Sequence, residues 1–172
     1  KVSAIEQVTE HVKHFTFVSE DGEKLPAFSG GSHVVLALNI NGRIHRNPYS
    51  LMSSPLNTES YGVSVRKQEM SRGGSVFMHE QIEVGSRIQI TYPVNLFSLS
   101  KLSHKNILIA GGIGITPFLS QIVDLNRIET DYELHYAYRS PEHAAFREEI
   151  EELCGDRSHF YVASDGQILD FY

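Results

Sequence analysis

The hydrophobic periodicity of this chain changes near residue 100. Before that point apolar and polar residues alternate, most clearly over 34–40, as they do in half-buried strands. Asn41 and Gly42 follow directly and favour a tight hairpin turn. The first half predicts strands at 15–17, 34–40, 43–46, 61–65 and 87–92, and a short helix at 75–82. Short strands at this spacing are typical of a small antiparallel barrel or sandwich.

After residue 101, short apolar runs alternate with segments of helical periodicity. We expect strands at 106–110, 132–138 and 159–163, and helices at 116–127 and 141–153. Strand–helix–strand–helix–strand predicts a parallel sheet with crossover helices. The predicted fold class is therefore an antiparallel β domain (residues 1–100) followed by an α/β domain (residues 101–172), with the boundary near 98–101.

Charge and cysteine content exclude several functions. The 172 residues carry 15 Lys+Arg against 21 Asp+Glu, a net charge of −6, without a basic stripe for nucleic acid. No apolar run reaches the ~18 residues of a membrane helix, and we expect a cytoplasmic protein. The single Cys154 cannot hold an iron–sulfur cluster. His11 and His14 have HxxH spacing, which on a strand puts them on opposite faces, so no metal site is expected.

A glycine turn, Gly111-Gly112-Ile113-Gly114, lies between an apolar run and a helix. Glycines there let a phosphate or ribose approach the backbone, and the helix start favours an anion. Pro117 stands where the dinucleotide fingerprint has its third glycine. The pattern therefore fits a nucleotide site and, equally, a tight turn without a ligand.

Two further motifs lie in the β half. Residues 46–51 (Arg-Asn-Pro-Tyr-Ser-Leu) combine a cation, an aromatic face and a hydroxyl, which suit a planar, phosphate-bearing ring. Residues 71–75 (Ser-Arg-Gly-Gly-Ser) offer backbone N–H groups, a hydroxyl and a guanidinium to a phosphate. Taken singly, the first also fits a turn with a core tyrosine and the second a helix cap.

Together the three motifs resemble those of the ferredoxin reductase superfamily, and more narrowly the phthalate dioxygenase reductase group that serves Rieske oxygenases. Residues 92–99 and 138–142 are also similar to that group, and the resemblance extends from the first strand to Asp165. It implies a flavin-binding Greek-key barrel followed by a domain that binds a nicotinamide nucleotide. Hydride would pass from the nicotinamide to flavin N5, and electrons would leave singly through an iron–sulfur centre.

The resemblance also implies roles for particular residues. It implies cofactor contacts from Arg46, Tyr49, Ser50, Leu51, Val65, Arg66, Lys67, Arg72, Gly73, Gly74, Ser75, Gly112, Gly114, Thr116, Arg139 and Ser140. Ser50 and Thr116 are the candidates at the reacting atoms, with Tyr49 against the flavin ring. The family spaces its arginine two residues before the tyrosine, whereas Arg46 precedes Tyr49 by three. Either Arg46 or Arg43 would then bond the flavin phosphate.

We expect FMN rather than FAD, because the Arg-Gly-Gly-Ser loop resembles the FMN-binding group. We expect NADH rather than NADPH, because Glu142 follows Arg139 closely and a carboxylate repels a 2′-phosphate. The expected electron acceptor is an oxygenase component or a ferredoxin. The alternatives are a free-standing NAD(P)H flavin reductase and a non-catalytic flavin-binding module.

Two features of the family are missing from this sequence. Nothing matches its Cys-Gly-Pro turn under the nicotinamide, and the four cysteines of a plant-type [2Fe–2S] centre are absent. We therefore expect these residues to be part of a longer polypeptide that completes the nucleotide domain and carries a ferredoxin domain.

Overall fold

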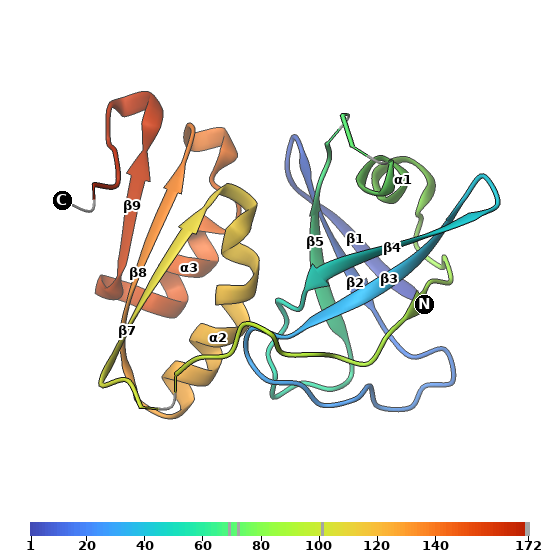
Figure 1. The fold of residues 1–172 in the computed structure, drawn as a ribbon, viewed down its shortest axis with the longest axis horizontal. Coiled ribbons are helices and arrows are strands. Elements are labelled where there is room, and N and C mark those ends of the chain that lie inside the picture. The colour runs from blue at the N-terminus through green and yellow to red at the C-terminus, as the bar shows by residue number, and fades with distance from the viewer. Residues whose placement is uncertain (69, 72, 101, 171–172) are drawn as a thin grey trace.

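A computed structural model of the protein describes residues 1–68, 70–71, 73–100 and 102–170 (Figure 1). The first half contains two three-stranded antiparallel sheets. One has the order β1 (Val2–Thr9), β2 (Val12–Phe17), β5 (Tyr61–Arg66), and the other the order β4 (Arg43–Ser50), β3 (His33–Ile40), β6 (Gln89–Ile90). The helix α1 (Gly74–Gln81) follows β5.

The two sheets share one core. Alternate residues of β2, β3 and β5 point inward, and Phe15, Leu36 and Val63 are fully buried in the same cluster. The segment after α1 joins the sheets: the Val2 N–H donates to the Ser86 carbonyl at 2.9 Å, and the chain then pairs with β3 through β6. The sheets thus close into the expected barrel, but the strand expected at 87–92 is reduced to the two residues of β6 because this segment crosses from one sheet to the other.

The β3–β4 hairpin turns at Asn41 and Gly42, whose φ angles of 51° and 78° confirm the expected turn. The strand β4 continues to Ser50, four residues beyond the expected end at Arg46. Pro48 has no backbone N–H, but β4 is the edge strand of its sheet and, among the described residues, pairs only with β3. No described strand on its other side requires an N–H donor, so proline is tolerated there. The strand therefore carries most of the 46–51 motif on regular backbone.

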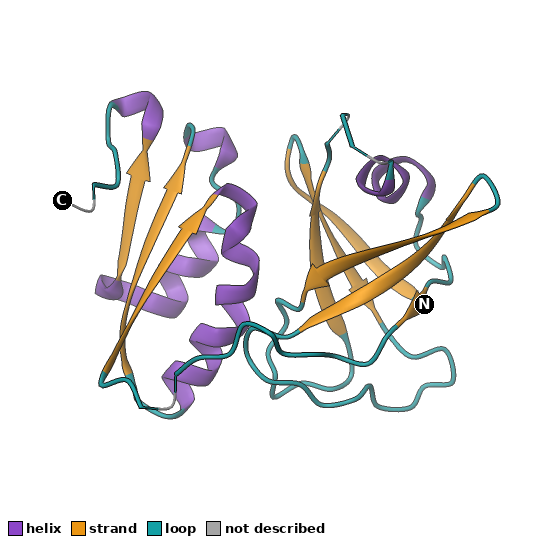
Figure 2. Cartoon of the chain, viewed as in Figure 1, coloured by secondary structure: helices purple, strands orange, loops and turns teal. Residues whose placement is uncertain are grey.

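The second half is a parallel sheet in the order β7 (Lys105–Gly111), β8 (Asp131–Tyr138), β9 (Ser158–Val162). The helices α2 (Thr116–Arg127) and α3 (Arg147–Cys154) connect its strands (Figure 2). Apolar side chains of both helices, including Ile122 and Ile150, pack on Leu134 and its neighbours in β8. Cys154 is buried in this core. The predicted fold class is confirmed, and α2 has the predicted bounds.

The single helix expected over 141–153 is wrong. Residues Pro141–His143 form one short 3₁₀ turn, and α3 begins only at Arg147. Between them Phe146 has a left-handed φ of 64°, which interrupts the helical backbone. Its carbonyl accepts the first hydrogen bond of α3, from the Ile150 N–H at 2.9 Å. Its ring lies edge-on to that of His14 in the barrel, with centroids 6.3 Å apart. Packing between the two halves of the molecule therefore overrides the local helical pattern.

The chain passes from barrel to parallel sheet over residues 91–104. Val94 still exchanges backbone hydrogen bonds with His33, each 2.9 Å long, whereas Leu99 already packs on the α/β core. This passage is compatible with a boundary near 98–101. The loop before β3 contacts α2 directly: the Gly30 N–H donates to Asp124 Oδ2 at 2.7 Å and the Gly31 N–H to Ser120 Oγ at 3.2 Å. The helix α2 thus lies between its sheet and the barrel (Figure 1).

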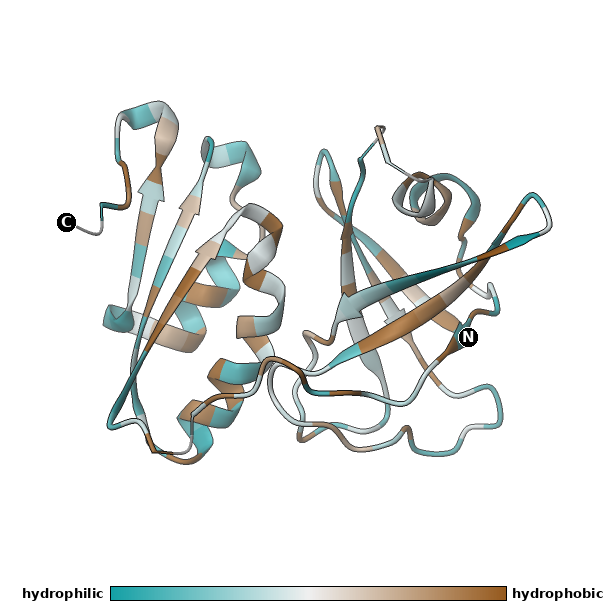
Figure 3. Cartoon of the chain, in the orientation of Figure 1, coloured by the Kyte–Doolittle hydropathy of each residue, from teal (hydrophilic) through white to brown (hydrophobic). Residues whose placement is uncertain are grey.

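The strand residues of the two cores are mostly apolar, and apolar residues such as Leu96 and Phe97 also occur in the segment between the two halves. Figure 3 shows the hydropathy of each residue along the chain. Among the described residues no helix combines the length and the apolar character that crossing a bilayer requires.

Candidate functional site

A cleft of about 560 Å³ opens beside the edge of the barrel, and we call it the barrel cleft. It is lined by Asn47, Pro48, Tyr49, Ser50, Ser64, Val65, Arg66, Gln68, Met70, Ser71, Gly74, Ser75, Ile113 and Thr116. These residues come from β4, β5, the start of α1 and the glycine turn. Three parts of the chain that the sequence analysis singled out separately therefore meet at one site.

Tyr49 and Ser50 form the β4 wall of the barrel cleft. Tyr49 is half-buried, and Asn47 donates a hydrogen bond from Nδ2 to its hydroxyl at 3.4 Å. Burial raises the pKa of the Tyr49 hydroxyl, so the ring presents a neutral face. Within the described residues the Ser50 hydroxyl has no hydrogen-bond partner and can serve a ligand. Leu51 is fully buried and supports this wall from the core.

The start of α1 forms the polar end of the barrel cleft. Gly73 has a left-handed φ of 91° and provides no side-chain cap, which leaves N–H groups of the first turn for an anion. Ser75 Oγ accepts a hydrogen bond from the Gln68 N–H at 3.1 Å. At Gly74 a Cβ atom would lie 2.1 Å from Asn47 Nδ2, so the carboxamide packs directly on this turn. The chemistry of this end fits a phosphate group.

A second cleft, of about 520 Å³, lies across the carboxyl ends of the parallel strands, and we call it the sheet cleft. Its lining includes Gly111, Gly112, Arg139 and, from the barrel, Arg66. Gly112 has a φ of 50°, which favours glycine. Cβ atoms on Gly111, Gly112 and Gly114 would meet nothing within 4 Å, so the space above the turn is open. Open alpha/beta sheets bind ligands at this position.

The loop after β8 carries negative charge at the rim of the sheet cleft. The Ser140 hydroxyl donates to Glu142 Oε1 at 2.6 Å and also contacts His143 Nδ1 at 2.8 Å. The hydrogen bond from Ser140 lowers the pKa of Glu142, so this carboxylate is ionised at neutral pH. Arg139 lies beside it and forms no ion pair with the described residues. The rim thus combines one available cation with one fixed carboxylate.

The two clefts adjoin, because Arg66 and Ile113 line both of them. Thr116, one residue past the 3₁₀ turn Gly112–Ile115, lines the barrel cleft and is 8% exposed. Its hydroxyl donates to the Ile113 carbonyl at 3.1 Å and fixes the turn between the clefts. Ligands in the two clefts would therefore meet at the glycine turn.

Comparison with known proteins agrees with this architecture. Residues 108–167 match the family model of the oxidoreductase NAD-binding domain. The structure superposes on phthalate dioxygenase reductase with a TM-score of 0.90 and 29% identity, covering 99% of this chain and 54% of that one. Over nearly its whole length the chain therefore has a fold similar to that of phthalate dioxygenase reductase.

Curated relatives of this ferredoxin reductase-like chain include subunits of a monooxygenase and of an oxidative N-demethylase. It is 46% identical over 171 residues to the carnitine monooxygenase reductase subunit of Escherichia coli (strain K12), covering 99% of this chain and 53% of the relative. It is 43% identical over 168 residues to the heme-dependent oxidative N-demethylase beta subunit of Ectopseudomonas mendocina (strain ymp), covering 98% and 53%. The chain thus spans about half the length of the curated relatives it matches.

Several residues that the superfamily resemblance implicated lie away from the two clefts. Arg46 is exposed on β4 and lines neither cleft. Arg43 starts β4 at the far end of the hairpin. Lys67 forms an ion pair with Glu80 at 2.9 Å. Gly73, Gly114 and Ser140 adjoin cleft residues without lining the clefts, and Arg72 lies outside the described residues.

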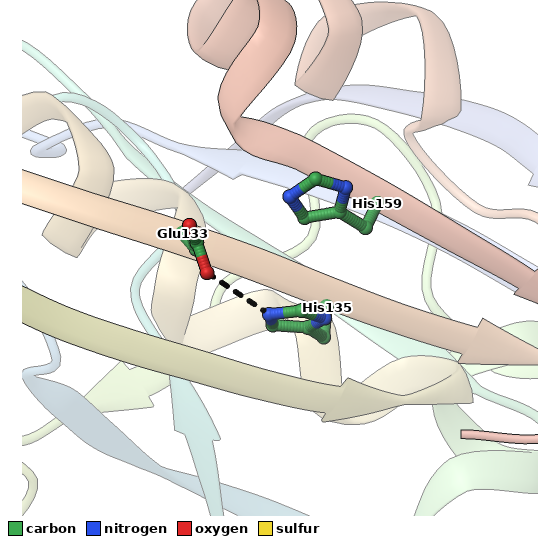
Figure 4. A group of neighbouring side chains, drawn as sticks. All are labelled: Glu133, His135 and His159. Atoms are coloured by element: carbon green, nitrogen blue, oxygen red, sulfur yellow. Dashed lines mark ion pairs between the residues drawn. The ribbon is translucent and has the colours of Figure 1, made fainter. Parts of the chain in front are cut away.

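Two groups of residues in this ferredoxin reductase-like chain were not among the residues predicted from sequence. Asn47, not Arg46, stands two residues before Tyr49 and reaches the start of α1, which strand alternation alone would have indicated. Glu133, His135 and His159 form a cluster on β8 and β9 (Figure 4). Only the pairing of the two strands brings His135 and His159 together, so no local motif marks this cluster.

Proposed function

We propose that this chain is the flavin- and nicotinamide-binding part of an electron-transfer reductase. It would pass electrons from NADH through a flavin, and through a [2Fe–2S] centre held outside these residues, to an oxygenase component or a ferredoxin in the cytoplasm. The observation that carries this proposal is the junction of the two clefts at Arg66 and Ile113. Hydride transfer requires the two reacting rings in contact, and two separate clefts would not allow it.

In this function the barrel cleft holds the flavin. When bound, the flavin accepts a hydride equivalent and releases electrons one at a time. Tyr49 packs against the ring, and the Ser50 hydroxyl hydrogen-bonds its edge near N5. The backbone of Val65 and Arg66 borders the ring from β5. Gly74, Ser75 and the Asn47 carboxamide hold the phosphate at the start of α1.

The sheet cleft holds the nicotinamide nucleotide. Because Gly111 and Gly112 have no side chains, the nucleotide can approach the protein backbone at the turn. Arg139 lies toward the adenosine part of the nucleotide. Thr116 stabilises the turn at which the two clefts join, and Ile113 lines both of them. The chain's residues position the two reactants and shield them from water, which is the usual contribution of a protein to cofactor chemistry.

FMN is the favoured flavin and NADH the favoured nucleotide. The polar end of the barrel cleft at α1 suits one terminal phosphate group, as FMN has. The ionised Glu142 at the rim of the sheet cleft disfavours the 2′-phosphate of NADPH and can accept a hydrogen bond from a 2′-hydroxyl. The names of the relatives, which are reductase or beta subunits of oxygenase systems, support an oxygenase as the partner.

The visible spectrum of the purified protein tests the proposal first. We expect oxidised-flavin bands, and mass spectrometry of the heat-released flavin should identify FMN. A chain that takes up neither FMN nor FAD would be a structural module and would contradict the proposal. FAD in place of FMN would overturn only the choice of flavin.

Reduction of the full-length natural protein then separates the remaining alternatives. We expect NADH to bleach the flavin bands anaerobically and a one-electron protein acceptor to reoxidise them. Efficient reduction of added free flavin, without transfer to a protein acceptor, would instead identify a free-standing flavin reductase.

A further inference from the structure

The face of the parallel sheet opposite α2 and α3 carries a cluster of potential metal ligands. Along β8 the side chains alternate, so that Leu134 packs under the helices while Glu133 and His135 point to the other face. His159 of β9 is the direct cross-strand partner of His135, and its side chain joins them there (Figure 4). One carboxylate and two imidazoles therefore converge from two neighbouring strands.

The distances suit a small metal ion. One ligand atom from each of the three side chains lies within 4.8 Å of the others. His135 Nε2 is 3.6 Å from Glu133 Oε2, and the two histidine rings stack with centroids 4.9 Å apart. Bonds of about 2.0–2.2 Å to Zn²⁺ bring tetrahedral ligand atoms to roughly 3.3 Å from one another. The exposed His159 ring can rotate to bring its nitrogen to this distance from the other two ligand atoms.

Neighbouring groups already orient two of the three ligands. Tyr161 Oη lies 2.8 Å from His135 Nδ1. With a metal on Nε2, Nδ1 keeps its proton and donates it to the Tyr161 oxygen, as the outer contacts of metal-bound histidines usually do. Lys105 Nζ donates to Glu133 Oε1 at 2.6 Å, which leaves Oε2 facing His135. Each contact occupies the ligand's outer atom and leaves its inner atom for an ion.

We propose that Glu133, His135 and His159 bind a divalent transition-metal ion of the Zn²⁺ type. Two imidazole nitrogens and one carboxylate oxygen suit Zn²⁺, Ni²⁺ or Cu²⁺, whereas Mg²⁺ prefers oxygen ligands only. Three protein ligands leave a coordination position for water. The ion ties β9 to β8 across the sheet, because its ligands come from both strands. None of the three ligands lines either cleft, although Tyr161, which contacts His135, also lines the sheet cleft. The site does not depend on the proposed function.

Calorimetric titration of the purified, untagged and chelator-treated protein with ZnCl₂ tests the site. We expect one equivalent of Zn²⁺ to bind and the melting temperature to rise with Zn²⁺, because a ligand that binds only the folded state stabilises it. MgCl₂ at the same concentration should change neither quantity.

Three variants locate the binding. His159→Ala and Glu133→Gln should each weaken Zn²⁺ binding at least tenfold, because each removes one ligand. His104→Ala removes another exposed histidine of the same domain and should leave the affinity unchanged within twofold. Flavin content provides an independent check that each variant is folded. Absence of Zn²⁺ binding, or equal affinity in the parent protein and His159→Ala, would overturn the proposal.

Discussion

Two pairs of glycines occupy opposite environments in this molecule. At Gly30 and Gly31, in the loop that meets α2, added Cβ atoms would lie 2.6 Å from Gln121 Cα and 2.2 Å from the Phe97 carbonyl oxygen. At Gly111 and Gly112, in the turn between β7 and α2, added Cβ atoms would meet nothing within 4 Å. The first pair lets protein approach protein, and the second leaves space for something that is not protein.

We expect this difference to separate glycines required by packing from glycines that serve the proposed nucleotide site. In the sequence both pairs are simply Gly-Gly, and either fits a tight turn. In the structure, packing explains Gly30 and Gly31, because a side chain at either position would collide with α2 or with Phe97. Their N–H groups also bond Asp124 and Ser120 of α2. Packing does not explain why residues 111 and 112 are glycines. This favours a bound nucleotide as the reason for these two glycines.

The largest expected effect is at Gly31. Its φ of 88° disfavours alanine, and a methyl group would also collide with the Phe97 carbonyl. We expect Gly31→Ala to lower the free energy of unfolding by about 3 kcal/mol, from left-handed strain plus overpacking. Urea unfolding measures it. Gly42→Ala is the matched control, because Gly42 has a φ of 78° and open space around it. Equal losses in both variants would show that crowding at Gly31 is unimportant.

The next largest effect, on NADH binding, is expected at Gly111, which belongs to the open pair of glycines. Gly111 has a φ of −123°, which any residue adopts, and it lines the sheet cleft. We expect Gly111→Val to change the free energy of unfolding by less than about 0.5 kcal/mol. The same variant should weaken NADH binding at least tenfold, because the side chain fills the open space. NADH titration measures the affinity, and unchanged flavin content is the internal control. If Gly111→Val leaves the NADH affinity unchanged, Gly111 and Gly112 do not serve NADH binding and have only a structural role.

Most of the fold could be predicted because its determinants are local. Period-2 runs and Asn41-Gly42 predicted the β3–β4 hairpin, and the apolar spacing after Thr116 predicted α2. The break before α3 could not be predicted, because Phe146 takes its left-handed conformation where it packs on His14 of the barrel. The strand expected at 43–46 likewise ended too early. The edge position of β4 explains why it continues through Pro48.

The candidate site was predictable where a motif acts through its own backbone. Tyr49, Ser50, Gly74 and Ser75 line the barrel cleft as the motifs indicated. The proposed phosphate contact was harder to predict. The charge of Arg46 drew attention to that residue, whereas Asn47 is the residue that packs on the start of α1. The cluster of Glu133, His135 and His159 depends on the register of two strands 24 residues apart at the paired histidines, which a single sequence does not reveal.

A smaller effect concerns charge at the open cleft. Glu142 is held by the Ser140 hydroxyl at the cleft rim and stays ionised at neutral pH. We expect Glu142→Gln to shift the ratio of kcat/KM for NADPH over NADH upward about fivefold, because an exposed carboxylate repels a 2′-phosphate only modestly. Steady-state kinetics on the full-length protein measure the ratio. Glu148→Gln removes one equal charge beside a different cleft and should leave the ratio unchanged. A ratio unaffected by Glu142→Gln would remove this carboxylate from nucleotide selection.

The smallest effect is a pH dependence at a third crowded glycine. A Cβ atom on Gly62 would lie 2.8 Å from the ring of His14, which also contacts Phe146 across the junction. Burial lowers the pKa of His14 below 6.5, although Glu6 opposes the shift. Above pH 6.5 His14 is neutral in both the folded and unfolded states and adds no pH dependence. As the pH falls through 6.5, the unfolded chain binds the proton first, so stability declines until the lower folded pKa is reached.

His14→Gln should therefore flatten the fall in unfolding free energy between pH 7.5 and 5.5 by less than about 1 kcal/mol. Urea unfolding at several pH values measures this slope, and His104→Gln should keep the parent's profile. If His14→Gln leaves the pH dependence of the unfolding free energy unchanged, the His14 ring is not constrained by its contact with Gly62. The contact would then differ from the crowded one at Gly31.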